Sequence, residues 1–151
     1  MSLRFTDTSK WADPWFLELP PMHKLIHQYL CDSCDCAGVW NVSLRDMQFR
    51  TGATEQEFYE FVKQAGDGRI AMLDSGRKLW LVKFIPFQYR SGFNIRNHIV
   101  KGIALCLSKV RAPLKRLPNN YYEPILEAMD SIHSIKGDTR GTTLPLQGVK
   151  E

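Results

Sequence analysis

Residues 51–87 constrain the fold of this chain most, because signals for a helix and then a hairpin follow one another there. Thr54 and Glu57 have the spacing of a capping box, which predicts that a helix begins after the tight break at 51–53. Gly66 and Gly68 end this predicted helix. Its apolar residues recur at helical spacing: Phe58, Phe61, Val62 and Ala65.

A β-hairpin is predicted directly after this helix. Residues 69–73 form the first strand, residues 74–76 the turn and residues 78–87 the second strand. Pro86 has no amide proton to donate, so it limits how far the second strand can pair.

Two helices and a short strand are predicted before residue 51. The first helix covers residues 21–34, and its entry suits Pro20 and Pro21. Residues 39–42 have the composition of a strand, and the Ser43 hydroxyl is expected to cap a second helix. The apolar stripe predicted for the first helix comprises Met22, Leu25, Ile26, Tyr29 and Leu30.

The order helix, strand, helix, turn, helix and hairpin is typical of a winged helix-turn-helix. We therefore expect an α+β, mainly helical fold: a winged helix-turn-helix with a small three-stranded sheet and C-terminal helices. A generic small α+β domain is the alternative. In a winged helix, the third helix would enter the major groove of DNA while the wing touches phosphate or the minor groove.

Two further helices are predicted towards the C-terminus. Ile95, Ile99, Ile103 and Leu107 share one face of a fourth helix that ends at Pro113, and residues 121–135 form a fifth. From residue 136 the chain has little to bury, so we expect a flexible tail. The predicted organisation is a winged-helix domain (1–92), a helical extension (93–135) and a tail (136–151).

Three stretches carry a family resemblance: Lys10-Trp11-Ala12-Asp13-Pro14-Trp15-Phe16, the residues 29–40, and Leu79-Trp80-Leu81-Val82-Lys83-Phe84-Ile85-Pro86-Phe87-Gln88. They resemble the N-terminal domains of phage replisome organisers over residues 4–92, and more loosely over 97–122. In that family the motifs are Lys-Trp-x-Asp-x-Trp-Phe, Leu-x-x-x-Cys-Asp-x-Ala-Gly-x-Trp and Trp-Leu-x-x-Phe-Ile-x-x-Gln. The resemblance implies a winged-helix fold and a role in starting phage or prophage DNA replication. It implies DNA and replication proteins as partners, and no catalytic residues.

The charge distribution suggests a localised anionic partner. Residues 67–116 carry eleven Lys/Arg against two Asp/Glu, whereas the segments on either side are acidic. A solvated basic helix face is the alternative explanation. The candidate DNA-binding residues are Gln56, Lys63, Arg69, Arg77, Lys78 and Arg96.

These candidates are expected to act differently. Arg77 and Lys78 flank the hairpin turn, where they would contact phosphate or merely keep the wing solvated. Gln56 has an amide that can read base edges. Glu55 and Glu60 lie on the same helix and would repel phosphate, so we expect the wing and the fourth helix to contribute more than the third.

A non-enzymatic protein without a cofactor is expected, because the chain has no P-loop, no GxSxG elbow and no HExxH motif. The rival to DNA binding is a winged-helix assembly module that docks a replication protein or helicase loader, or forms a homo-oligomer. The absence of a long apolar run and of a signal-peptide layout at the N-terminus predicts a cytoplasmic location without a membrane partner. The cysteines would then be reduced.

The first helix also places His23, His27, Cys31 and Cys34 near one stripe. Imidazoles four residues apart can share a zinc ion. Four ligands on one straight helix cannot easily close a tetrahedron, and no second cysteine pair has knuckle spacing. We therefore expect no metal site, and the resemblance suggests a packing role for Cys34. Trp11, Trp15 and Phe16 are expected to cover a core rather than to stack on bases.

Overall fold

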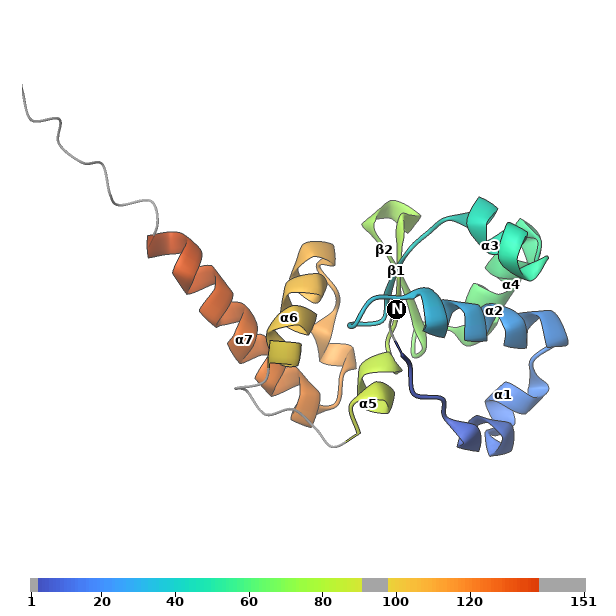
Figure 1. The fold of residues 1–151 in the computed structure, drawn as a ribbon, viewed down its shortest axis with the longest axis horizontal. Helices are drawn as coiled ribbons and strands as arrows, with labels where there is room; N and C mark the ends of the chain where they lie inside the picture. Colours follow the sequence, from blue (N-terminus) through green and yellow to red (C-terminus); the bar gives the residue numbers. More distant parts are fainter. Residues whose placement is uncertain (1–2, 91–97, 139–151) are drawn as a thin grey trace, which may run out of the picture.

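Helices lie on both sides of a small sheet in the computed structural model, which describes residues 3–90 and 98–138 (Figure 1). A 3₁₀ turn, η1, and a short helix, α1, precede the first long helix, α2. The elements in chain order are η1 (Thr8–Ala12), α1 (Pro14–Glu18), α2 (Pro21–Ser33), β1 (Val39–Asn41), α3 (Leu44–Thr51), α4 (Glu55–Ala65), β2 (Ile70–Leu73), η2 (Asp74–Gly76), β3 (Lys78–Leu81), α5 (Phe84–Gln88), α6 (His98–Val110), η3 (Leu114–Arg116) and α7 (Asn119–Asp138).

The three strands form one antiparallel sheet with β3 in the middle, in the order β1-β3-β2. Trp80 of β3 lies opposite Val39 of β1 and Ala71 of β2. The expected pairing of the short early strand with the hairpin is therefore confirmed. Together with α2, α3 and α4, this sheet makes the α+β, mainly helical fold of a winged helix-turn-helix, with β2 and β3 as the wing.

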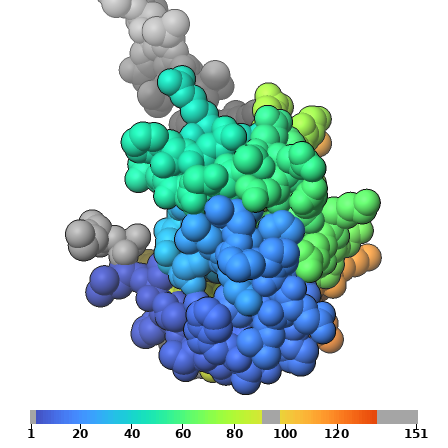
Figure 2. Space-filling view, turned by 90° about the vertical axis from the view of Figure 1, so that its right-hand side faces the viewer, coloured from blue at the N-terminus to red at the C-terminus, as the bar shows by residue number. Residues whose placement is uncertain are grey.

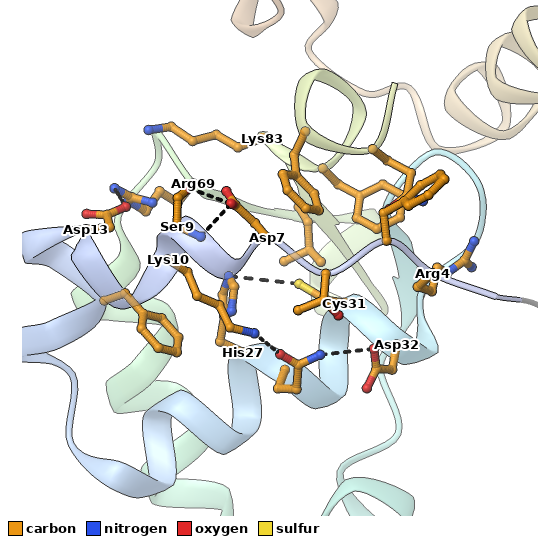
Figure 3. A pocket seen from close by; sticks show the side chains of 18 of the residues that line it. Arg4, Asp7, Ser9, Lys10, Asp13, His27, Cys31, Asp32, Arg69 and Lys83 are labelled. Carbon is orange, nitrogen blue, oxygen red and sulfur yellow. Dashed lines mark hydrogen bonds and ion pairs between the residues drawn. The ribbon is translucent and has the colours of Figure 1, made fainter. Parts of the chain in front are cut away.

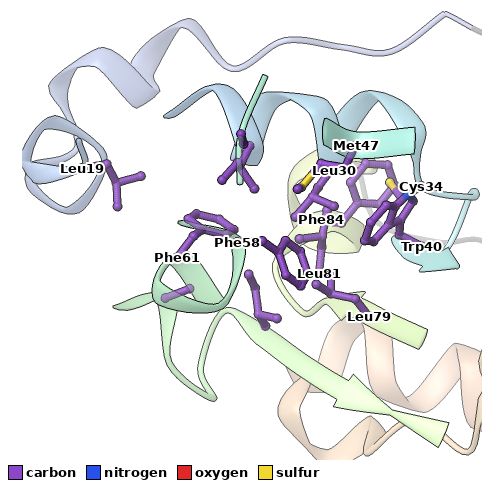
Figure 4. Packing of buried hydrophobic residues seen from close by; sticks show 14 of the residues in the cluster. Leu19, Leu30, Cys34, Trp40, Met47, Phe58, Phe61, Leu79, Leu81 and Phe84 are labelled. Atoms are coloured by element: carbon purple, nitrogen blue, oxygen red, sulfur yellow. The ribbon is translucent and has the colours of Figure 1, made fainter. Parts of the chain in front are cut away.

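Alternate side chains of β3 enter two different hydrophobic cores. Leu79 and Leu81 pack with residues of α2, α3 and α4, including Leu30 and Phe58 (Figure 4). Trp80 and Val82 point to the other face, where α6 and α7 cover the sheet. The period of two along a strand explains this division, because successive residues leave opposite faces.

Helix α4 begins as its sequence predicts. The Thr54 hydroxyl accepts a hydrogen bond from the Glu57 amide at 3.2 Å, and the Thr54 amide donates to the Glu57 carboxylate at 2.7 Å. Phe58, Phe61 and Ala65 form the buried side of the helix. Gly66 then ends it with a positive φ of 68°, where a residue with a Cβ would be strained.

The second wing strand is shorter than predicted. It ends at Leu81, and Phe84–Gln88 forms the short helix α5 instead of continuing the strand to residue 87. The strand has no partner beyond this point, because β2 begins at Ile70. The last hydrogen bond between the two segments is from the Val82 amide to the Arg69 carbonyl. Pro86 adds no donor to a ladder, but it fits the first turn of a helix.

Two predicted apolar faces are partly wrong. Leu25 of α2 is 44% exposed, whereas His23 is buried, and Ile99 of α6 is also 44% exposed. Steps of four residues drift around a helix by about 40° each, so a long run of such steps leaves the buried face. The buried residues of α6 are Val100, Ile103, Ala104 and Leu107.

The ends of two helices differ from those predicted. The Ser43 hydroxyl makes no cap bond, although Ser43 precedes α3 as expected. Helix α7 extends from Asn119 to Asp138 and so includes residues 136–138, which were assigned to the tail. Ile95, the boundary after residue 92 and the tail from 139 onward lie outside the described residues.

Candidate nucleic-acid interface and N-terminal pocket

The helix-turn-helix face is built by α3 and α4, which lie side by side in Figure 2. Gly52 joins them in the left-handed conformation, and its amide donates to the Gln48 carbonyl at 2.8 Å. Met47 and Phe58 are fully buried, so the other sides of the two helices face outward. Their exposed residues are Arg45, Gln48, Phe49, Arg50, Glu55, Gln56, Tyr59, Glu60, Lys63 and Gln64.

Gln56 and Lys63 are both exposed on α4, as predicted. The Gln56 amide donates to the Glu60 carboxylate at 2.9 Å, so one carboxylate oxygen of Glu60 already accepts a hydrogen bond. Lys63 has no ion pair among the described residues. Arg45 is an exposed cation on α3 that sequence reasoning missed. A residue two positions before the buried Met47 lies on roughly the opposite side of the helix, so this spacing would have predicted that Arg45 is exposed.

Arg77 and Lys78 lie at the wing tip, where the chain turns through residues 74–76. Arg77 pairs with the Asp74 carboxylate at 2.8 Å, and Lys78 donates to the side-chain oxygen of Asn41. Both contacts are at the surface, and an exposed ion pair such as that of Arg77 contributes little and is easily exchanged for another. The two cations are therefore accessible to an anionic partner.

Arg69 lies at the opposite end of the hairpin from Arg77 and Lys78, because it immediately precedes β2. Its guanidinium is 3.9 Å from the centre of the Trp15 ring and 3.7 Å from the Asp13 carboxylate. Arg69 therefore holds the N-terminal segment against the winged helix. Arg96, the remaining candidate, lies outside the described residues.

A pocket of about 250 Å³ opens beside Arg69, between the N-terminal segment, α2 and α5 (Figure 3). Residues 4–10 form one wall, and Lys10 donates to the Gln28 amide oxygen on α2 at 2.5 Å. Side chains of two kinds dominate the lining. The aromatic ones include Phe5, Trp15, Phe16, Phe84 and Phe87, and the cationic ones are Arg4, Lys10, Arg69 and Lys83. Three carboxylates line the pocket as well, those of Asp7, Asp13 and Asp32.

Four buried polar atoms in this lining have no hydrogen-bond partner. They are Arg4 Nε, Trp15 Nε1, His27 Nδ1 and Gln88 Oε1, and no other such atom occurs in the described part of the chain. Each unpartnered buried group costs about 1–3 kcal/mol, so native proteins rarely gather several of them in one place. Sequence reasoning did not find this pocket, because its walls combine residues 4–32 with residues 69–88.

His27 and Cys31 lie one helical turn apart in the wall of the pocket, with His27 Nε2 3.9 Å from the Cys31 sulfur. Burial, with smaller contributions from Lys10 and Arg69, lowers the pKa of His27 to about 4. Burial raises the pKa of the Cys31 thiol to about 11. Both side chains are therefore uncharged near neutral pH.

The stripe that suggested a zinc site is divided among different contacts. His23 Nδ1 lies 2.8 Å from the Gln64 amide oxygen, and the Cys34 sulfur lies 3.4 Å from the Cys31 carbonyl oxygen. Cys34 is buried in the first core. In residues 3–90 and 98–138, no group of three or more His, Cys, Asp and Glu side chains is placed to hold a metal ion.

The raised thiol pKa values predict slow cysteine chemistry. Burial raises the pKa of Cys34 to about 12, and that of Cys31 to about 11. At pH 8 the thiolate fraction of Cys31 is then roughly 100-fold lower than that of a free thiol. We expect slow reaction with Ellman's reagent in the native protein and rapid reaction of all four cysteines in guanidinium chloride. Equal rates in the two conditions would contradict the burial of these thiols.

None of the described helices combines the length and the apolar character needed to cross a membrane. Comparisons with protein-family models, with curated proteins and with solved structures find no match to this chain.

Proposed function

We propose that this chain is a non-enzymatic DNA-binding winged-helix protein of phage or prophage origin that acts in the cytoplasm in the initiation of DNA replication. The observation that carries DNA binding is the arrangement of the helix-turn-helix and the wing. Gln56 and Lys63 are exposed on α4, and Arg77 and Lys78 lie at the wing tip. The role in replication, with replication proteins as further partners, rests on the resemblance to replisome organisers.

Phosphate contacts would supply most of the affinity. The wing-tip cations suit the phosphate backbone, and the Gln56 amide suits a base edge. Glu55 and Glu60 reduce the attraction of α4 for phosphate, so binding tolerates changes of DNA sequence. The sequence favoured the wing and the fourth predicted helix, which is α6, over the third, which is α4. Because α6 packs on the other face of the sheet from α4, we instead assign the DNA contacts to the wing and α4.

DNA binding is expected to depend steeply on salt. With three to six phosphate contacts, affinity for a duplex falls on the order of 10²–10³-fold between about 50 and 200 mM salt. Fluorescence anisotropy titrations across a salt series measure this dependence. In the double variant Arg77→Ala/Lys78→Ala, the slope of log affinity against log salt should decrease in magnitude by about 2.

A charge-matched control uses two exposed lysines of α6. The variant Lys101→Ala/Lys109→Ala removes the same charge from another part of the surface and should leave the slope unchanged. An equal effect of both variants would exclude a specific wing contact. Absence of binding at about 50 mM salt would exclude the proposed function itself.

A protein-docking module is the second candidate, and a specific observation favours it. Phe49 of α3 is 87% exposed, and Tyr59, which precedes Glu60 on α4, is 50% exposed. Such a surface suits a basic partner with an apolar anchor, or a second copy of the chain. Solution mass with and without DNA distinguishes the candidates, because a tight oligomer that is indifferent to DNA favours docking.

A further inference from the structure

The N-terminal pocket has the features of a binding site that the wing does not use. It lies at the base of the hairpin, beside Arg69 and Leu81, whereas Arg77 and Lys78 lie at the tip. All four buried polar atoms without a partner in the described residues belong to its lining. Buried polar atoms without a partner are rare in native proteins, so their concentration in one place makes this pocket a candidate ligand site.

The uncommitted charge of the pocket is mainly positive. Its one carboxylate without an ion pair among the described residues is Asp32, which accepts a hydrogen bond from the Gln28 amide at 3.1 Å. Asp7 and Asp13 are already paired, with Arg90 at 3.1 Å and with Arg69 at 3.7 Å. Lys83 is exposed and has no ion pair among the described residues. Lys10 bonds only to the neutral amide of Gln28 among those residues. An anionic group would therefore be attracted to these lysines of the lining.

Two of the four unpartnered atoms are donors. Trp15 Nε1 and Arg4 Nε each carry a proton. Gln88 Oε1 is an acceptor, and the role of His27 Nδ1 depends on the ring tautomer. Oxygen acceptors on a ligand would satisfy both donors. Among the aromatic residues of the lining, Phe5 is 77% exposed and Phe87 is half-buried, so these two rings are the surfaces against which a flat ring can stack.

We propose that this pocket binds a mononucleotide, that is, a flat heterocycle linked to a phosphate. The ring packs against Phe5 and Phe87, and the phosphate lies near Lys10. Because the unpartnered atoms are buried beneath the pocket surface, side chains of the wall must turn aside as the ligand enters. The nucleotide is either free in solution or an unpaired nucleotide of single-stranded DNA.

The test titrates the full chain with deoxyadenosine monophosphate (dAMP) by calorimetry. We expect a dissociation constant on the order of tens of micromolar, as for a ligand of this size. Lys10→Ala should weaken binding by about tenfold or more, because it removes a charge-assisted contact. Lys24→Ala is the matched control. Both ammonium groups lie over the Phe16 ring, at 5.7 Å for Lys10 and 5.8 Å for Lys24, but only Lys10 lines the pocket.

Trp15→Phe tests the donor separately from the ring. It keeps an aromatic side chain against Arg69 and removes the indole N–H, and it should weaken dAMP binding by about three- to tenfold. Unchanged binding in both Lys10→Ala and Trp15→Phe would overturn the proposal. So would the absence of dAMP binding at ~1 mM, or equally tight binding of inorganic phosphate or adenosine alone.

A short single-stranded oligodeoxyadenylate distinguishes the two sources of the nucleotide. Tighter binding than dAMP, with the same sensitivity to Lys10→Ala, supports the proposal with single-stranded DNA as the source. Weaker binding than dAMP supports the free nucleotide. Arg77→Ala/Lys78→Ala should leave dAMP binding unchanged, so this proposal and duplex binding by the wing can fail independently.

Discussion

Replacing Trp80 with alanine is expected to lower the free energy of unfolding by about 3–5 kcal/mol, as large-to-small substitutions of buried aromatic residues do. Trp80 is fully buried at the centre of the middle strand. Its indole N–H donates to the Ala37 carbonyl at 3.1 Å, and its ring is part of the core beneath α6 and α7. Urea unfolding followed by circular dichroism measures the change.

Two further variants separate the causes of this loss. Trp80→Phe keeps most of the ring and leaves the buried Ala37 carbonyl without its donor, so the expected loss is smaller, about 1–3 kcal/mol. Phe49→Ala removes a ring that is 87% exposed and should change stability by less than about 0.5 kcal/mol. A loss below about 1 kcal/mol for Trp80→Ala would contradict the tight packing of the second core.

Gly38→Ala is expected to destabilise the protein by about 2–4 kcal/mol, the sum of backbone strain and crowding. Gly38 has a φ of 83°, and an added Cβ would lie 2.7 Å from Phe84 Cβ and 3.0 Å from the Leu81 carbonyl oxygen. The Leu81 oxygen belongs to the backbone and cannot turn aside as a flexible side chain can. The unfolding midpoint in urea reports the loss.

Gly52→Ala isolates the backbone contribution. Gly52 has almost the same φ, 78°, but an added Cβ would meet no atom within 4 Å. Its expected cost is about 1 kcal/mol, and the difference between the two variants measures the crowding around Gly38. Equal effects of the two substitutions would mean that the residues around Phe84 shift to accommodate the added Cβ at little cost in free energy.

The parts of the fold that could be predicted are those with local causes. The capping box at Thr54 and Glu57 requires only residues three apart, and it begins α4 as expected. The glycines at 52 and 66 likewise end helices by their own positive φ. These signals set the order of elements, and the order identified the winged helix-turn-helix.

The parts that could not be predicted depend on distant partners. The composition of residues 78–87 suits a strand. However, β3 ends at Leu81 because the neighbouring strands β1 and β2 offer no pairing partner beyond it. Leu25 has the spacing of a buried residue, yet the described elements leave it 44% exposed. For the candidate site, the exposure of Gln56 and Arg77 followed from the sequence. The contact of Arg69 with Trp15, and hence the pocket, required the N-terminal segment to fold back.

The two hydrophobic cores on either side of β3 constrain how this protein can evolve. Val39, Ala71, Trp80 and Val82 present an apolar surface that α6 and α7, together with Ile85 of α5, shield from water. A recombination event that exchanged the C-terminal helices for an unrelated module would leave this surface bare and prone to aggregation. The winged helix and its C-terminal helices are therefore constrained to be inherited together, as a single evolutionary unit.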